Sequence, residues 1–307
     1  MENHSFSKGW IWHEMDFADP DQLQVLLADY HVPDDWIRHV YKEDQNTLQM
    51  NRTAGGKESL WGTITYKQRP DKREAEKMMH FFISREVLVT AHLDFGSLES
   101  LDKDRILTNM ESVASPLEGF MAILDDVTTS FLSQIDALEV DIRKLMWELE
   151  EENGEKVLDR LMNLRHQLLV MKNLIIPISE LHMASKEAFS EDCREKFFDR
   201  VGRQIHRCEY LISQYTEEVS TMVDLEEVTA SVMGNEIMKS LTVITLLFTP
   251  ISAWGAWWGM NFKYMPELDE KYGYLFAALF ILINTALLFF FLKTKGWMGD
   301  ILNRKKR

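Results

Sequence analysis

A stripe of small and polar side chains runs through the C-terminal third of the sequence, where the chain is otherwise apolar. Its members recur at alternating spacings of three and four residues, which places them on one face of a helix. Oxygen atoms along such a face can line a water-filled pore, and small side chains can equally let two membrane helices pack closely. Both readings stay open from the stripe alone. Its members are Asn235, Met238, Thr242, Thr245, Thr249, Ser252, Ala256 and Gly259.

The other faces of this helix are apolar. No ionisable residue lies on the stripe, which argues against a proton relay or a charged binding pocket there. Pro250 can kink the helix, which is tolerated where neighbouring helices or water satisfy the freed carbonyl. The apolar faces carry Leu241, Ile244, Leu247, Phe248 and Ile251.

The composition limits the classes of protein that the chain can belong to. Its net charge of −15 over 307 residues argues against general nucleic-acid binding and suits a surface that tolerates cations. Two cysteines, Cys193 and Cys208, imply no disulfide framework and indicate a reducing compartment. The N-terminus has no signal-peptide pattern. Residues 1–105 contain no phosphate-binding loop, nucleophile elbow or paired catalytic carboxylates, so we expect no enzyme.

Two uncharged runs follow Lys239, the last residue of the densely charged region. They span Ser240 to Phe262 and Gly273 to Leu292, and each reaches the roughly 20 residues that a helix needs to cross a bilayer. The second run is apolar all round, as expected of a helix facing lipid, and its Asn284 suits a hydrogen bond between helices. The sequence therefore predicts two membrane passes.

The flanks of the two runs predict their orientation. Basic residues follow the second run and acids lie in the connection, so the positive-inside rule places the N-terminal region and the C-terminus in the cytoplasm. We expect a multi-pass protein of the plasma or inner membrane, with an outer aromatic belt of Trp254, Trp257, Trp258, Tyr272 and Tyr274. The basic residues are Lys293, Lys295, Arg304, Lys305, Lys306 and Arg307, and the acids expected to attract cations are Glu267, Asp269 and Glu270.

The N-terminal third indicates mixed α and β structure. Gly9–Asp16, Ser59–Gln68 and Phe81–Ala91 are rich in aromatic and β-branched residues, as strands are, and the last predicts a hairpin turning at Ser84-Arg85-Glu86. A helix is predicted to start at Asp19-Pro20. Its apolar face would carry Leu23, Leu26, Leu27 and Tyr30.

A helical pattern begins near residue 111. One helix is expected to reach Glu152, before a cap at Asn153-Gly154, and a second to return from Glu155 to Ala188, interrupted at Pro177. The acidic tip of this hairpin has two readings, a solvated helix end or a surface that concentrates cations. Its acids are Glu148, Glu150, Glu151, Glu152 and Glu155.

A third helix is predicted to continue without a break into the first membrane run. It carries an apolar seam at spacings of four and three, as coiled coils do. Sixty-odd helical residues would extend roughly 90 to 100 Å, which is typical of a stalk leading into a membrane. The seam consists of Val201, Ile205, Cys208, Ile212, Tyr215, Val219 and Met222.

The connection between the two membrane runs resembles the signature of the CorA family of magnesium and cobalt transporters. It reads Gly259-Met260-Asn261-Phe262, then Met265-Pro266-Glu267-Leu268 and Tyr272-Gly273-Tyr274. The preceding Asn235–Thr242 segment is similar to the family's junction between stalk and membrane. The motif directly follows one membrane helix and precedes a short loop and a second one, and this combination is specific.

The resemblance implies a homopentameric channel with an α+β cytoplasmic domain, a long helical stalk and two C-terminal transmembrane helices. It would conduct hydrated divalent cations passively, Mg²⁺ foremost and also Co²⁺ or Ni²⁺, without a prosthetic group. Gly259, Met260 and Asn261 would form the selectivity filter, because neutral oxygens can bind the waters that Mg²⁺ releases reluctantly. The pore would be lined by Asn235, Met238, Leu241, Thr242, Thr245, Thr249, Ser252 and Ala256.

The resemblance also divides the chain into segments. These are an α/β domain over 1–110, a helical hairpin over 111–190, a stalk helix over 191–236, a pore helix over 237–260, an external loop over 261–272, a second transmembrane helix over 273–293 and a basic cytoplasmic tail over 294–307.

Three positions depart from the family pattern. Lys263 begins the loop where many relatives have an acid. Thr249 stands where some relatives have a bulky apolar gate, so the constriction could instead lie at Met238 or Leu241. Arg203 takes the place of an acid linked to regulatory metal binding between subunits, which puts metal-gated closure in doubt.

Two rival functions stay open. Zinc transporters of the ZntB type share the fold and the Gly-Met-Asn region, although His206 and Cys208 point to different helix faces and no cluster of soft ligands is visible. The chain could also be a membrane-tethered sensor or scaffold with a dimerising stalk. The polar stripe and Asn261 argue against this last reading.

Overall fold

The computed structural model describes two compact units, Met1–Val223 and Asp224–Arg307. The elements in chain order are β1 (Glu2–Ser5), β2 (Ile11–Met15), β3 (Thr47–Asn51), β4 (Ser59–Arg69), β5 (Lys72–Ile83), β6 (Val87–Ala91), α3 (Lys103–Ser112), α4 (Pro116–Glu151), α5 (Glu155–Ala188), α6 (Lys196–Trp258) and α7 (Gly273–Thr294). The described residues are 2–15, 30, 32–33, 36, 45–52, 58–69, 72–98, 100–151, 155–189, 196–261, 263, 265 and 270–297.

The first unit contains one sheet with strand order β1-β2-β6-β5-β4-β3. Only the β2–β6 pair is parallel among these pairings. The predicted hairpin is confirmed, since β5 and β6 pair antiparallel and Ser84 N donates to Val87 O across the turn at 2.9 Å. The polar strands β1 and β3 and the first part of β5 were not predicted, because their residues lack the β-branched pattern. The helix predicted from Asp19 lies outside the described residues.

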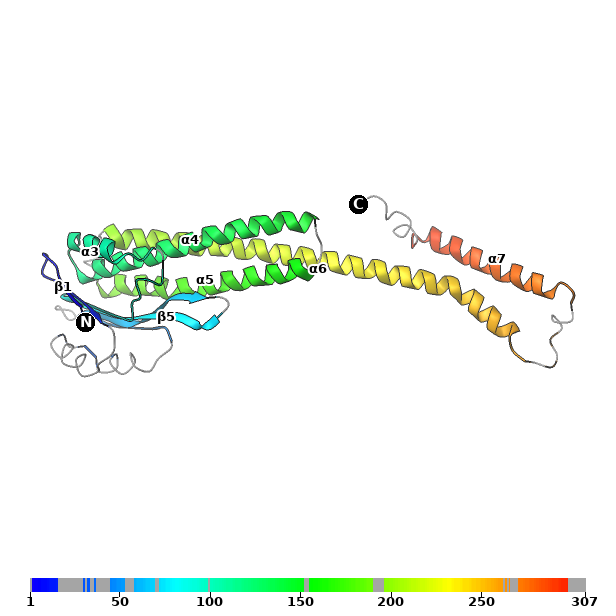
Figure 1. The fold of residues 1–307 in the computed structure, drawn as a ribbon, viewed down its shortest axis with the longest axis horizontal. Coiled ribbons are helices and arrows are strands. Elements are labelled where there is room, and N and C mark those ends of the chain that lie inside the picture. The colour runs from blue at the N-terminus through cyan, green and yellow to red at the C-terminus, as the bar shows by residue number, and fades with distance from the viewer. Residues whose placement is uncertain are drawn as a thin grey trace. The chain divides into compact units, whose positions relative to one another are not determined.

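The helices of this unit pack beside the sheet, with α4, α5 and the first part of α6 side by side (Figure 1). Helical structure starts at Lys103, earlier than the predicted residue 111, because the Asp102 carboxylate caps α3 by accepting from the backbone N–H groups of Asp104 and Arg105. The interruption expected at Pro177 was wrong, as α5 continues through it. Buried neighbours such as Ile175 and Ile178 hold the helix in place despite the lost hydrogen bond.

The main core of the first unit joins sheet and helices in one apolar cluster, and a second, smaller cluster includes Met15, Trp36 and Phe82. Trp10 donates its indole N–H to Val113 O at 3.3 Å, and its ring covers Gly119 of α4. A Cβ atom at Gly119 would lie 2.4 Å from the Trp10 ring, so only glycine allows this approach. The seam predicted on the third helix is confirmed as buried, with Tyr215 partly buried at its edge.

Buried acids of α4 secure the start of α6. The Glu118 carboxylate accepts the backbone N–H groups of Phe197 and Phe198, which have no partner within the helix, and an anion at this end also suits the helix dipole. The Oδ1 atom of Asp125 lies 2.9 Å from the Nε atom of Arg200 on α6, so the two side chains form an ion pair. Burial raises the pKa of Asp125, against the effect of the Arg200 charge. The sequence analysis did not single out these contacts, because they join residues far apart in the chain.

The second unit contains the end of α6 and all of α7. Both are long and apolar enough to cross a membrane. Val243 of α6 and Leu292 of α7 are buried and belong to one apolar cluster. Four partly buried residues pack against this cluster, namely Leu246, Leu247, Leu288 and Phe289. The second predicted membrane run agrees with α7, and α6 ends at Trp258, two residues before the predicted end of the pore helix at residue 260.

Candidate functional site

The polar stripe lies on the face of α6 that α7 leaves open. The residues that pack against α7 include Val243, Leu247 and Trp254, which contacts Phe280 edge-on at 4.9 Å. By helical periodicity the stripe faces roughly the opposite direction. Its members Thr245, Thr249, Ser252 and Ala256 are exposed, and Thr242 is half-buried. The chain's own second helix therefore does not provide the close-packed partner that one reading of the stripe requires.

The threonine hydroxyls of the stripe are oriented by the helix backbone. Thr242 donates to Met238 O at 2.7 Å, Thr245 to Leu241 O at 2.8 Å, and Thr249 to Thr245 O at 2.8 Å. Each hydroxyl proton is thereby engaged, and the oxygen lone pairs are left as acceptors. Water molecules around a cation donate their protons outward, so a row of acceptors suits a hydrated cation. Sequence spacing alone did not show this polarity.

A shallow depression lies on the same face. It is lined by Ile244, Thr245, Phe248, Thr249, Ser252 and Ala253. The remaining predicted pore residues, Asn235, Met238 and Leu241, are also exposed. Seven of the eight predicted pore residues are thus exposed, and Thr242 is half-buried.

The predicted filter residues lie just beyond the last turn of α6. Gly259 N donates to Gly255 O at 3.0 Å, and Met260 N donates to Trp257 O at 3.4 Å. A Cβ atom at Gly259 would lie 2.9 Å from Gly255 O, so glycine lets the chain leave the helix here. Asn261 follows with an exposed side chain. Its amide is thus available to solvent at the end of the stripe.

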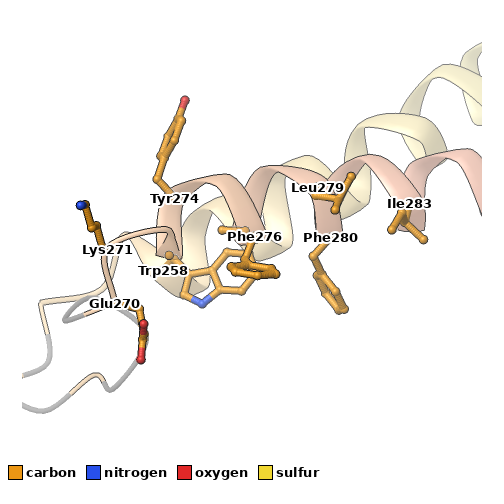
Figure 2. Close-up of a pocket in the computed structure, with 10 residues that line it drawn as sticks. Trp258, Glu270, Lys271, Tyr274, Phe276, Leu279, Phe280 and Ile283 are labelled. Carbon is orange, nitrogen blue, oxygen red and sulfur yellow. The ribbon is translucent and has the colours of Figure 1, made fainter.

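Aromatic rings gather at this end of the two helices. Trp254 and Trp258 stack with centroids 5.5 Å apart. In Figure 2, Trp258 lies under the first turns of α7 beside Phe276, while Tyr274 points to the other side of α7. Glu270 and Lys271 lie on the connection that leads into the helix. Tryptophan and tyrosine in this arrangement are typical of a membrane–water interface.

The charged residues predicted to flank the membrane lie partly within the described chain. Glu270 is exposed at the start of α7, and Lys293 and Lys295 are exposed at its other end. The 22 residues of α7 extend about 33 Å, which matches a bilayer core of about 30 Å. Glu267, Asp269 and the basic residues Arg304, Lys305, Lys306 and Arg307 lie outside the described residues.

A flank of large apolar side chains on α6 borders the stripe, and the sequence analysis assigned a role to only one of its members, the predicted pore residue Leu241. The flank recurs at spacings of three and four, which was the available signal. In the second unit it is exposed, although its side chains are large and apolar. The flank consists of Met233, Ile237, Leu241, Ile244, Phe248 and Ile251.

The other residues considered for metal chemistry are not brought together. Cys208 is buried, and burial raises the pKa of its thiol to about 12, whereas His206 is exposed. At the acidic tip Glu148 pairs with Arg160 across the hairpin, which favours the reading of a solvated helix end for this acid. The side chains of the other four acids lie outside the described part of the chain. Arg203 is exposed and has no ion pair with any described residue.

Comparison with known proteins then decides the family. A family model described as "CorA-like Mg2+ transporter protein" matches residues 7–294. The chain belongs to this family. The magnesium transport protein CorA of Bacillus subtilis is 36% identical over 310 residues, covering 100% of this chain and 97% of that protein. The resemblance to CorA transporters drawn from the sequence is therefore confirmed.

Solved structures support the fold of this CorA-family chain. The complete structure of the CorA magnesium transporter from Methanocaldococcus jannaschii has a TM-score of 0.69 at 16% identity, covering 97% of this chain and 94% of that chain. The ZntB cytoplasmic domain from Vibrio parahaemolyticus has a TM-score of 0.57 at 15% identity, covering 74% and 91%. The predicted α+β domain, long helix and two C-terminal apolar helices are confirmed as the CorA fold.

Proposed function

We propose that the chain is a pore-forming subunit that conducts hydrated Mg²⁺, and also Co²⁺ or Ni²⁺, passively across a membrane. The observation that carries the proposal is the stripe of α6, which is turned away from α7 and presents hydroxyl oxygens as acceptors. Family membership supports the same function. The membrane potential contributes about 2.3 kcal/mol per charge at 100 mV, so a dication needs no ATP to enter.

A selectivity filter at Gly259, Met260 and Asn261 completes the proposed pore. A ring of neutral amide and carbonyl oxygens can hold the waters of Mg²⁺ without removing them. Carboxylates would bind a dication more tightly and slow its release, whereas conduction needs weak binding at several positions. The exposed Glu270, together with Glu267 and Asp269, would concentrate cations near the entrance.

We propose a homopentamer, because one subunit supplies only one wall of a pore. The apolar flank beside the stripe supports this arrangement. If the flank of one α6 packs against the next copy, the contact is heterologous and can close into a ring with the stripes inside. The exposed Phe248 and Ile251 would then be covered by a neighbour.

The proposed orientation places both termini in the cytoplasm. Lys293 and Lys295 mark the cytoplasmic end of α7, and the aromatic residues Trp258 and Tyr274 mark the outer interface. In this orientation the first unit and the basic tail belong to the cytoplasm, and the filter lies at the outer end of the pore.

Ion flux into liposomes tests the proposed function. Purified protein is reconstituted at defined oligomeric state, and uptake of Mg²⁺, Co²⁺, Ni²⁺ and Zn²⁺ is measured at an imposed negative-inside potential. We expect Mg²⁺ flux that rises with the potential and needs no nucleotide. Flux restricted to Zn²⁺ would favour a zinc transporter of the ZntB type, and no flux from a correctly assembled oligomer would favour a sensor or scaffold.

A further inference from the structure

Three metal-ligating side chains converge on one face of the hairpin formed by β1 and β2. Glu2 and His4 alternate along β1 and so share a face, and Glu14 of β2 lies opposite Glu2. One ligand atom from each residue lies within 4.8 Å of the other two. The hairpin register thus places a mixed nitrogen and oxygen set at one point of the first unit.

The distances within this set suit a shared ion better than hydrogen bonds. His4 Nε2 lies 3.6 Å from Glu2 Oε2 and 3.8 Å from Glu14 Oε2. Both separations exceed hydrogen-bond length. They are similar to the spacing between ligands around one ion whose bonds are about 2.0 to 2.2 Å long. The Nε2 atom is buried and makes no hydrogen bond within the described chain, and the imidazole is held against Trp12 with centroids 5.1 Å apart.

Lys103 at the start of α3 already places a positive charge between the two carboxylates. Its Nζ lies 2.6 Å from Glu2 Oε2 and 2.7 Å from Glu14 Oε2. The Lys103 side chain is about one-third exposed and can move into solvent when another cation takes its place.

We propose that Glu2, His4 and Glu14 form a binding site for a divalent transition-metal ion such as Co²⁺ or Zn²⁺, with the Lys103 ammonium as its intramolecular competitor. Two carboxylates neutralise the dication, and the imidazole supplies the nitrogen ligand that such ions prefer. Mg²⁺ prefers a shell of oxygen atoms and keeps its waters, so this set selects against it. The site therefore distinguishes transition metals from Mg²⁺.

Cobalt absorption spectroscopy on the full-length protein in detergent tests this site. The protein carries no N-terminal tag, and excess Mg²⁺ occupies sites built from oxygen ligands alone. We expect Co²⁺ to produce a visible d–d band of the intensity typical of four- or five-coordinate nitrogen-containing sites, saturating at one ion per chain. The fully hydrated or oxygen-bound ion absorbs far more weakly, so ions in the proposed pore do not interfere.

Three variants separate the ligands from the competitor. His4→Gln keeps a polar side chain of similar size and is expected to abolish the band. Lys103→Met removes the competing ammonium and is expected to lower the apparent Kd on the order of tenfold, the effect of losing two partly exposed ion pairs. His166→Gln changes an exposed histidine on α5 and is the matched control, with an unchanged titration.

Several outcomes would overturn the proposal. They are a wild-type protein without the band at millimolar Co²⁺, a band that survives in His4→Gln, or an affinity unchanged by Lys103→Met. Ion flux is not part of the readout, so the site and the proposed transport function stand or fail separately.

Discussion

Single neutral oxygen atoms decide the chemistry of the proposed pore. Thr245 and Thr249 direct their hydroxyl protons to the helix backbone and leave acceptors for water, while Asn261 adds an amide at the end of the stripe. None of these groups carries a full charge. Under the proposed function, they would bind a hydrated dication weakly enough to release it, as conduction requires.

Removal of the Asn261 amide is expected to abolish transport. In Asn261→Ala the filter loses the oxygen that binds the ion's waters, whereas packing is unchanged because the side chain is exposed. Flux into liposomes and the oligomeric state of the same sample are measured together. Asn284→Ala on α7 is the matched control, because Asn284 donates to Phe280 O within its own helix. Normal flux in an assembled Asn261→Ala protein would contradict the filter assignment.

Buried His80 should make the protein sensitive to acid. Its Nδ1 atom lies at hydrogen-bond distance, 2.7 Å, from the Thr63 hydroxyl oxygen, and burial, with a smaller effect of the nearby His92, lowers the pKa of His80 from 6.5 to about 4. Its pKa is lower in the folded than in the unfolded chain, so stability is fully present above about pH 6.5 and is lost as the pH falls toward 4. The loss reaches about 3 kcal/mol over this range.

Thermal unfolding of the protein in detergent as a function of pH measures this effect. His80→Gln should flatten the decline in Tm between about pH 6.5 and pH 4, whatever its effect at neutral pH. Part of the decline should remain, because burial also lowers the pKa of His13 and His182. His166→Gln on the exposed surface of α5 should leave the decline unchanged. An identical pH profile for wild type and His80→Gln would refute the assignment.

At the scale of elements, α6 has two roles, and both depend on the helical spacing of its residues. Its first part buries an apolar seam against α4 and α5, and its last part presents a polar stripe that α7, the other described helix of the second unit, leaves largely exposed. The buried carboxylate of Glu118 holds the start of the helix, and Gly259 ends it. The element that anchors the first unit is therefore the element that would line the pore.

Cysteine accessibility along α6 tests which face meets water. Cysteines at Thr245, Ser252 and Ala256 should react with small water-soluble thiol reagents and block conduction. Cysteines at Ile244, Leu247 and Ile251 should not, because Leu247 packs against α7 and the other two lie on the apolar flank. The replacement of Cys193 and Cys208 by serine removes background labelling. Equal reactivity all around the helix would reject the pore stripe.

At the scale of the whole molecule, the exposed flank and stripe of α6 support the proposal that several copies assemble. The flank from Met233 to Ile251 is apolar and exposed, and a lone subunit would present it to lipid or water beside a polar stripe. In the proposed homopentamer, a ring of copies would cover the flanks and enclose the stripes. Contacts between the first units of neighbouring copies would then influence the proposed pore through the continuous helix α6.

Arg203 is expected to affect how contacts between copies regulate the proposed pore. It is exposed on α6, carries a permanent positive charge and cannot ligate a metal, but it can pair with a carboxylate of a neighbouring copy. We expect removal of Mg²⁺ to change the arrangement of the first units of neighbouring copies little. With Arg203 at this position, there is no ring of acids here whose mutual repulsion bound Mg²⁺ would relieve. Protease protection of α6 with and without a chelator measures the change.

The Arg203→Asp variant is the matched comparison for that measurement. It restores an acid at the position, so its protease protection should depend on Mg²⁺ where that of the wild type does not. Strong Mg²⁺-dependent protection of the wild-type protein would show that other acids bind a regulatory metal and that the reading of Arg203 is wrong.

Local patterns in the sequence determined most of the architecture of this protein. Hydrophobic runs of sufficient length predicted the two apolar helices, since a helix that crosses a bilayer needs about 20 apolar residues. The seam from Val201 to Met222 and the stripe from Asn235 to Gly259 followed from helical periodicity. Strands β2, β4 and β6 followed from their aromatic and β-branched residues. Each of these features depends on neighbours within one segment.

Only the tertiary structure decided the features that join distant segments. The polar strands β1 and β3 exist because the sheet supplies their hydrogen-bond partners, and α5 passes Pro177 because buried neighbours on both sides hold it. The cap from Glu118 to the start of α6 and the convergence of Glu2, His4 and Glu14 depend on strand register and helix packing. Such contacts arise when the chain is folded, so no spacing in the sequence could show them.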